Sequence, residues 1–138
     1  MKLSLTADAG EMHIGDETFD VTLESTMFVQ ITDDDLSKRI ALEMVRVTRS
    51  GGYILCRDWV VPKPGDRNYK ALSRKRVAAL FDVGLRSSLV SVFNGALVPP
   101  LGRFLSAHSP ALYFPVQACL PFLVGQKTYV LRVADRNR

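Results

Sequence analysis

Polar side chains stand at two points where a run of strand-forming residues stops. Glu24, Ser25 and Thr26 close a run rich in β-branched residues, and Arg57 with Asp58 lies at the end of a nearly continuous apolar run. Open α/β sheets bind ligands at the carboxyl ends of their strands, so these groups predict a ligand site shared by two strands. Alternatively, Glu24 is a polar strand end that reaches solvent, and Arg57 and Asp58 form an exposed ion pair.

Several common catalytic and metal-binding patterns do not occur in the sequence. His13 and His108 stand alone, and Cys56 and Cys119 do not cluster with histidines as zinc ligands do. No nucleophile-elbow, zinc-protease or phosphate-loop motif is present. We therefore expect no metal. Two cysteines are too few for a disulfide framework, which favours reduced thiols and a cytoplasmic location.

Acidic and basic residues are unevenly distributed along the 138 residues. The first 35 residues carry net charge −8 and the remainder +12, which gives the formal total of +4. Six bases lie between Lys63 and Arg76 and could bind an anionic ligand, although such a stretch is more often a solvated helix start. Only Tyr69 is available there to stack on a base, so we expect no nucleic-acid partner.

The periodicity of apolar residues predicts the elements that position these groups. Strands are expected over 3–6, 19–26, 52–61, 85–93 and 127–133, and helices over 33–49 and 71–81. Asp33 to Asp35 suit a helix N-terminus, and Ser50-Gly51-Gly52 is a typical stop signal for that helix. Prolines divide 99–124 into short helical pieces that form core packing or a pocket lid, with a membrane-facing or lipophilic-substrate patch as a minor alternative.

Strands that alternate with helices predict an α/β fold with a mainly parallel sheet, because parallel neighbours need a crossover such as the 33–49 helix. A hydrophobic content of 47% suits one compact domain over 1–138. No run approaches the ~20 apolar residues of a transmembrane helix. The start of the chain, with one lysine followed by acids, is not expected to be a signal peptide.

The stretch from Phe19 to Trp59 resembles the second half of a class I S-adenosylmethionine-dependent methyltransferase. Phe19-Asp20 matches the opening of one family strand, and Ser50-Gly51-Gly52 matches the turn before the next. Upstream, Asp8-Ala9 resembles the family's Asp-Ala before that strand. The resemblance implies a partial Rossmann-like fold with an antiparallel last strand, S-adenosylmethionine as cofactor, and a small-molecule methyl acceptor.

The same resemblance implies roles for individual residues. Asp8 would accept from the adenine amino group, with the backbone at Ala9 against the ring, although Asp8 alternatively caps its own loop. The backbone from Glu24 to Thr26 would face the methionine part of the cofactor. Arg57 and Asp58 would lie toward the substrate. Gln30 stands where many relatives place a histidine, so no catalytic base is assigned.

The family's glycine-rich cofactor loop is absent from this sequence, and Met1 falls where the third family strand begins. We therefore expect the distal half of the domain, from about the third to the seventh strand. Without the first family strand, the 19–26 strand would have an open apolar edge that invites pairing. A second copy of the chain in a homo-oligomer, or a separate N-terminal half, would provide a strand that pairs with that edge. The alternative function is a non-catalytic remnant or interaction module that dimerises through it.

Overall fold

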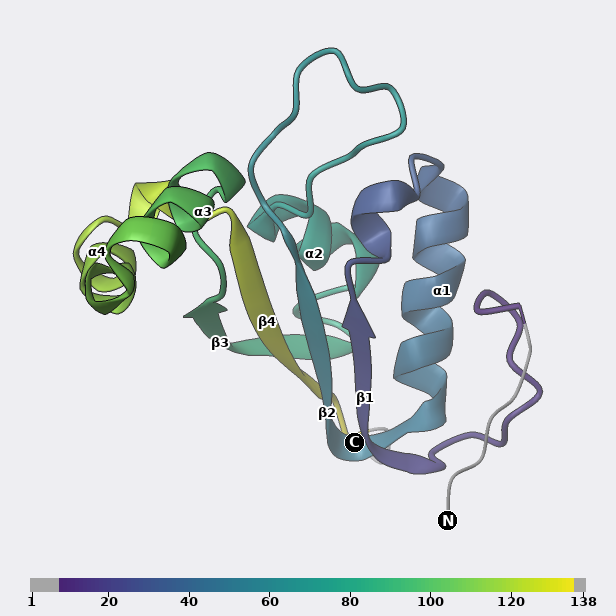
Figure 1. Ribbon diagram of the computed structural model, residues 1–138. Coiled ribbons are helices and arrows are strands. Elements are labelled where there is room, and N and C mark those ends of the chain that lie inside the picture. Colours follow the sequence, from purple (N-terminus) through teal and green to yellow (C-terminus); the bar gives the residue numbers. More distant parts are fainter. Residues whose placement is uncertain (1–7, 136–138) are drawn as a thin grey trace.

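The computed structural model describes residues 8–135, and the strand expected over 3–6 lies outside this range. Within it, four strands form one sheet in the order β1-β2-β4-β3 (Figure 1). The strands are β1 (Phe19–Ser25), β2 (Thr48–Trp59), β3 (Ser87–Asn94) and β4 (Gln126–Val133). The α/β class and the partial Rossmann-like fold are confirmed.

The direction of the strands explains why the sheet is only partly parallel. β1 is parallel to β2, whereas β4 is antiparallel to both β2 and β3. Three strands therefore point the same way, and the expected antiparallel last strand is confirmed. Because β4 lies between β2 and β3, β1–β2 is the one parallel pair among the described residues.

Helix α1 (Asp34–Val47) is the crossover between the two parallel strands. Its N-cap is Asp33, whose side chain accepts hydrogen bonds from the backbone N–H groups of Asp35 and Leu36. The predicted acidic N-terminus is therefore confirmed. The expected glycine stop is wrong, because β2 begins directly at Thr48. Gly52 instead lies beside the irregularity in the β1–β2 pairing, where β2 approaches β1 so closely that a Cβ atom would be 2.8 Å from the Asp20 carbonyl oxygen.

The main core lies between the sheet and the pair α1 and α2 (Arg74–Leu80). Phe28 and Phe81 meet edge to face there, with ring centroids 5.8 Å apart, over the buried Ile54 of β2. The other face of the sheet carries exposed apolar side chains, including Val21, Leu23 and Tyr53. In the described part of the chain, the helices α1 and α2 thus cover one face of the sheet only.

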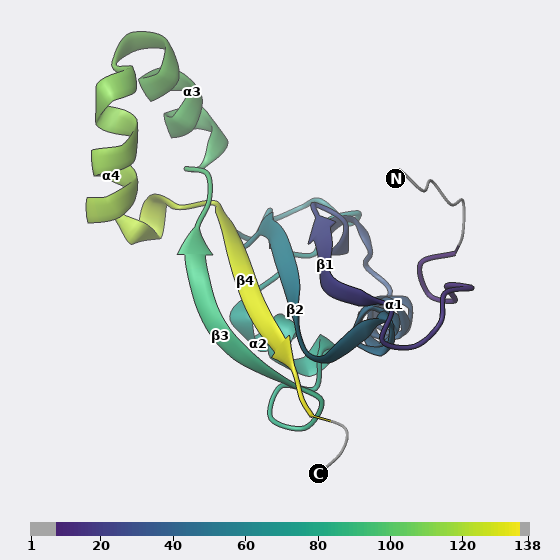
Figure 2. The same cartoon turned by 90° about the horizontal axis from the view of Figure 1, so that it is seen from below.

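Between β3 and β4 the chain forms a helical arm, residues 97–124, that extends beyond the sheet (Figure 2). It comprises α3 (Pro99–His108), η2 (Pro110–Leu112), α4 (Tyr113–Cys119) and η3 (Pro121–Leu123). A small separate core holds it together, centred on Leu97, Leu105 and Val124. The predicted short helical pieces are confirmed. None of the described helices has the length and apolarity needed to cross a membrane.

Candidate functional site

The carboxyl end of β1 turns sharply beside β2. Thr26 follows the strand with φ of 62°, a left-handed conformation uncommon for a residue with a side chain. Its backbone N–H donates to the Arg57 carbonyl oxygen at 2.9 Å. The short helix η1 (Phe28–Gln30) comes next. The turn therefore brings the ends of β1 and β2 together, as the sequence predicted for these two groups of polar residues.

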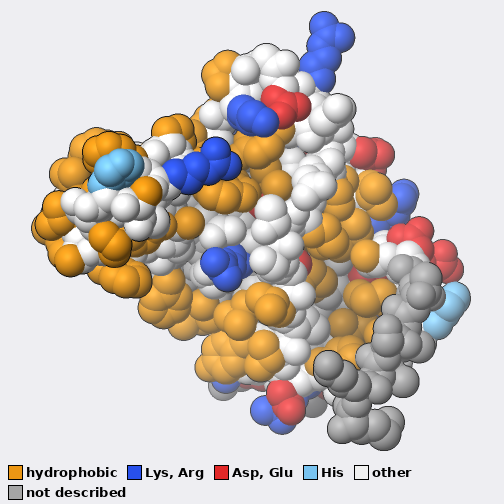
Figure 3. All heavy atoms as spheres, viewed as in Figure 1, with side chains coloured by type: hydrophobic (Ala, Val, Ile, Leu, Met, Phe, Trp, Pro, Cys, Tyr) orange, Lys and Arg blue, Asp and Glu red, His pale blue; other side chains and the backbone are white. Residues whose placement is uncertain are grey.

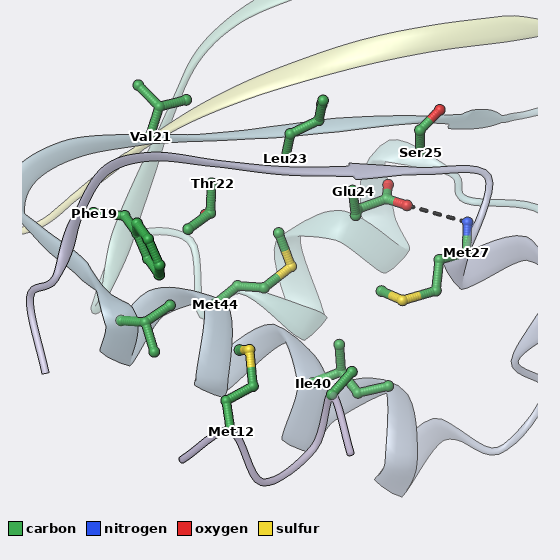
Figure 4. Close-up of a pocket in the computed structure, with 12 residues that line it drawn as sticks. Met12, Phe19, Val21, Thr22, Leu23, Glu24, Ser25, Met27, Ile40 and Met44 are labelled. Carbon is green, nitrogen blue, oxygen red and sulfur yellow. Dashed lines mark hydrogen bonds between the residues drawn. The ribbon is translucent and has the colours of Figure 1, made fainter. Parts of the chain in front are cut away.

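Glu24 is buried at this strand end, so it is not a polar strand end that reaches solvent. One carboxylate oxygen, Oε2, accepts the Met27 backbone N–H at 3.2 Å (Figure 4). The other, Oε1, has no hydrogen-bond partner within residues 8–135. Burial, reinforced by the neighbouring Asp58 carboxylate, raises the pKa of Glu24 to about 8. At neutral pH the side chain is therefore mostly protonated and has unused hydrogen-bonding capacity.

Glu24 lies in an apolar trough of about 490 Å³ along the open edge of β1. In Figure 4, Thr22 and Glu24 point toward the α1 side of the strand, whereas Val21, Leu23 and Ser25 point away from it. The lining combines β1 with α1 and the preceding loop, namely Ala9, Met12, Phe19, Val21, Thr22, Leu23, Glu24, Ser25, Met27, Ile40, Met44 and Val47.

Three of the predicted cofactor residues, Ala9, Glu24 and Ser25, line this trough together. Thr26 lies just beyond it in the turn. Asp8 is exposed, and its Oδ1 accepts the Gly10 backbone N–H at 2.8 Å, which is the loop-capping arrangement considered above. The structure thus places Ala9 near the β1 end although the two are distant in the sequence.

Arg57 and Asp58 lie on opposite faces of β2 and are not an exposed ion pair. Arg57 is exposed, and its Nε donates to Gln126 Oε1 at 3.2 Å. Asp58 is fully buried and accepts two backbone N–H groups, those of Val29 at 2.8 Å and Trp59 at 2.7 Å. Burial is the main cause that raises the pKa of Asp58. Its carboxylate therefore holds the turn after β1 in position.

Arg76 also fixes this turn, a role that the sequence did not reveal. Its guanidinium donates to the carbonyl oxygens of Phe28 at 3.0 Å and Ile31 at 2.7 Å, and to Ser37 Oγ at 3.1 Å. It further donates to the Lys70 carbonyl oxygen at 2.7 Å. This base of the 63–76 stretch is therefore directed into the protein. The key partners lie more than 30 residues away in the sequence, where no local pattern could indicate them.

Several solved structures share the fold of this chain. No family model matches the sequence, and no curated protein matches it. Solved structures do match. A S-adenosylmethionine-dependent methyltransferase from Methanosarcina mazei is 11% identical with a TM-score of 0.59; the match covers 94% of this chain and 65% of that one. A putative methyltransferase in complex with the Haloferax volcanii Trm112 activator is 14% identical with a TM-score of 0.60. This match covers 96% of this chain and 61% of that one.

The [4+2]-cyclase SpnF matches as well, at 16% identity and a TM-score of 0.60, over 94% of this chain and 56% of that one. A chain of this fold is thus named for a cyclisation, which illustrates that fold alone does not determine the reaction. The chain spans less than two thirds of the length of these three proteins. It has part of the fold of a class I S-adenosylmethionine-dependent methyltransferase.

Proposed function

We propose that this chain supplies the β1–β2 side of an S-adenosylmethionine site and takes part in methyl transfer to a small-molecule acceptor. The observation that carries the proposal is the buried Glu24 oxygen without a partner, at the carboxyl end of a strand in a sheet with methyltransferase topology. Strand ends of this kind are where open α/β sheets bind ligands.

The residues at the end of β1 fit the methionine part of the cofactor. That part carries an ammonium group and a positively charged sulfur, and a nearby cation favours the ionised form of a buried carboxyl group. Glu24, with one oxygen unused, is suited to accept a hydrogen bond from the ammonium. The backbone of Ser25 and Thr26 would lie beside the same methionine part of the cofactor. Ala9, in the same trough, would lie against the adenine, and Asp8 would need to leave Gly10 to bind the adenine amino group.

On the acceptor side, Arg57 offers an exposed guanidinium at the end of β2. Asp58 would act as a positioning residue, because its oxygens already hold the turn that carries Glu24 and Thr26. Gln30 donates through Nε2 to the Thr26 carbonyl oxygen at 3.0 Å and so supports the same turn. The bound cofactor would supply a methyl group on a sulfonium, which the acceptor's nucleophile attacks. The chain's own contribution would be alignment and exclusion of water.

A second candidate function, a module that pairs through the β1 edge without catalysis, is favoured by a different observation. The outer edge of β1 has no partner strand within residues 8–135, and the trough beside it is almost wholly apolar. Such an edge accepts an added strand readily. The two functions are compatible if the added strand comes from a partner that completes the cofactor site. That the Haloferax protein was solved with an activator supports a protein partner for chains of this fold.

Isothermal titration calorimetry with S-adenosylhomocysteine, after sizing by light scattering, tests the proposal. We expect saturable one-site binding at roughly millimolar affinity, since only part of the site is present. Glu24→Gln should weaken it about tenfold, the value of a hydrogen bond to a charged group. Glu11→Gln, the same substitution at an exposed position, is the matched control. A folded chain that releases no heat at several-millimolar ligand would instead support the non-catalytic module.

A further inference from the structure

The helical arm presents large apolar side chains to solvent. Phe104, Phe114 and Phe122 are 58%, 74% and 75% exposed, and Leu112 is 52% exposed. Figure 3 shows that hydrophobic side chains are grouped over the arm, at the left of the view. Isolated exposed apolar residues are normal, but a group of this size on one protruding segment indicates an interaction surface.

These phenylalanines are not needed for the arm's own core. That core is built from Leu97, Leu105 and Val124, with Tyr113 and Leu123 packed against it. Phe104 stacks on the ring of His108 at 4.8 Å between centroids, but both side chains remain exposed. The arm can therefore bury these phenylalanines in a partner or a lipid interface without losing its own core.

Positive charge predominates around the arm, although the adjacent loop also carries Asp66, which forms an ion pair with Lys63. No acidic residue occurs in the sequence from position 83 to position 134, and the arm itself carries Arg103 and His108. The loop rich in bases lies alongside, because Lys63 and Tyr69 line one groove with Val98 and Pro99 of the arm. A protruding apolar segment with basic neighbours is the pattern of proteins that bind the surface of an anionic bilayer.

We propose that the helical arm inserts its exposed phenylalanines into the interface of an anionic membrane, with Arg103 and the exposed bases Lys63 and Arg67 of the adjacent loop against the lipid headgroups. The arm would lie in the membrane surface without crossing it. The proposal does not depend on cofactor binding.

Co-sedimentation with vesicles tests this inference. We expect the chain to bind vesicles of phosphatidylcholine mixed with phosphatidylglycerol, to bind phosphatidylcholine alone much less, and to be released by salt. The triple substitution Phe104→Ser, Phe114→Ser and Phe122→Ser should weaken binding roughly tenfold or more. A matched control, Tyr53→Ser, Leu85→Ser and Val90→Ser, removes three exposed apolar residues from outside the arm and should bind like the parent chain.

Two results would overturn the proposal. One is binding to anionic vesicles that the triple phenylalanine substitution leaves unchanged. The other is absence of vesicle binding together with a dimer, measured by light scattering, that the same substitution dissociates. Should that variant fail to fold by circular dichroism, Arg103→Glu provides the test, since it changes one exposed side chain and should weaken binding to the anionic vesicles alone.

Discussion

The Asp58 carboxylate, near the end of β2, accepts the backbone N–H of Val29 at 2.8 Å, and this bond ties the turn after β1 to the neighbouring strand. Asp58 is fully buried and also accepts its neighbour's N–H at Trp59. The conformation of the candidate site therefore depends on a side chain that is not expected to touch a ligand.

Replacement of Asp58 by alanine should lower the free energy of unfolding by about 3 kcal/mol, because it leaves the buried Val29 N–H without an acceptor. Asp58→Asn keeps one acceptor oxygen and should cost less. Urea denaturation followed by circular dichroism measures both. Asp20→Asn, which removes the exposed ion pair with Arg49, should change stability by less than about 1 kcal/mol. Equal losses for Asp58→Ala and Asp20→Asn would refute the role given to Asp58.

Glu24 should make the stability of the fold depend on pH. The unfolded chain releases this proton near pH 4.5, whereas the folded chain keeps it to about pH 8. Because the folded state binds the extra proton between these values, the free energy of unfolding should fall as the pH rises through that window. Glu24→Gln removes the ionisation and should stabilise the chain by about 4 kcal/mol at pH 8, with little effect at pH 4.5. Urea titrations at several pH values measure the difference.

The matched substitution Glu11→Gln should leave the pH dependence of the parent chain intact. A Glu24→Gln chain with the same slope as the parent between pH 5 and pH 8 would contradict the burial of an ionisable Glu24.

Gly52 should tolerate no side chain. A Cβ there would lie 2.8 Å from the Asp20 carbonyl oxygen and 2.9 Å from that of Arg49, both backbone atoms that cannot easily move. We expect Gly52→Ala to lower the free energy of unfolding by about 2 kcal/mol, as overpacking does. Thermal unfolding compares it with Gly15→Ala, whose added Cβ would meet only the Thr18 hydroxyl at 3.5 Å. Similar melting temperatures for the two variants would disprove the close approach of β1 and β2 at Gly52.

Arg76→Lys should destabilise the turn although it keeps the charge. A lysine offers one ammonium group and cannot reach the Phe28 and Ile31 carbonyl oxygens together, as the guanidinium fork does. We expect a loss of about 2 kcal/mol, measured by urea denaturation. Arg74→Lys, two positions earlier on the exposed side of α2, should be nearly neutral. If both substitutions have the same effect, Arg76 is an ordinary surface base.

The sequence predicted the elements whose residues repeat with a clear period and missed what depends on distant contacts. The 33–49 helix was found because Ile40, Met44 and Val47 share one face, and all three are buried. The start of β2 was misplaced because Gly51-Gly52 is also a common helix stop. In the structure Gly52 allows the close approach of β2 to β1. This contact cannot be inferred from a local pattern, because β1 lies some 30 residues earlier in the sequence.

The same limit applies to the candidate site. The position of Glu24 at a strand end indicated a ligand site, since strand ends are where α/β sheets bind ligands. Its burial and its unused oxygen depend on packing against η1 and α1, which the sequence does not display. Asp58 and Arg76 were assigned outward-facing roles because charged residues are usually exposed. The partners that tie them to the turn after β1 include backbone groups 29 and 48 residues away in the sequence.

Two-dimensional ¹H–¹⁵N NMR on the intact chain can map where S-adenosylhomocysteine binds. We predict that the amide signals of Ala9 and of Glu24 to Thr26 shift with a single saturating dependence on ligand concentration, while those of the helical arm do not move. A well-dispersed spectrum without shifts at several-millimolar ligand, or shifts confined to other surfaces, would contradict a cofactor site at the end of β1.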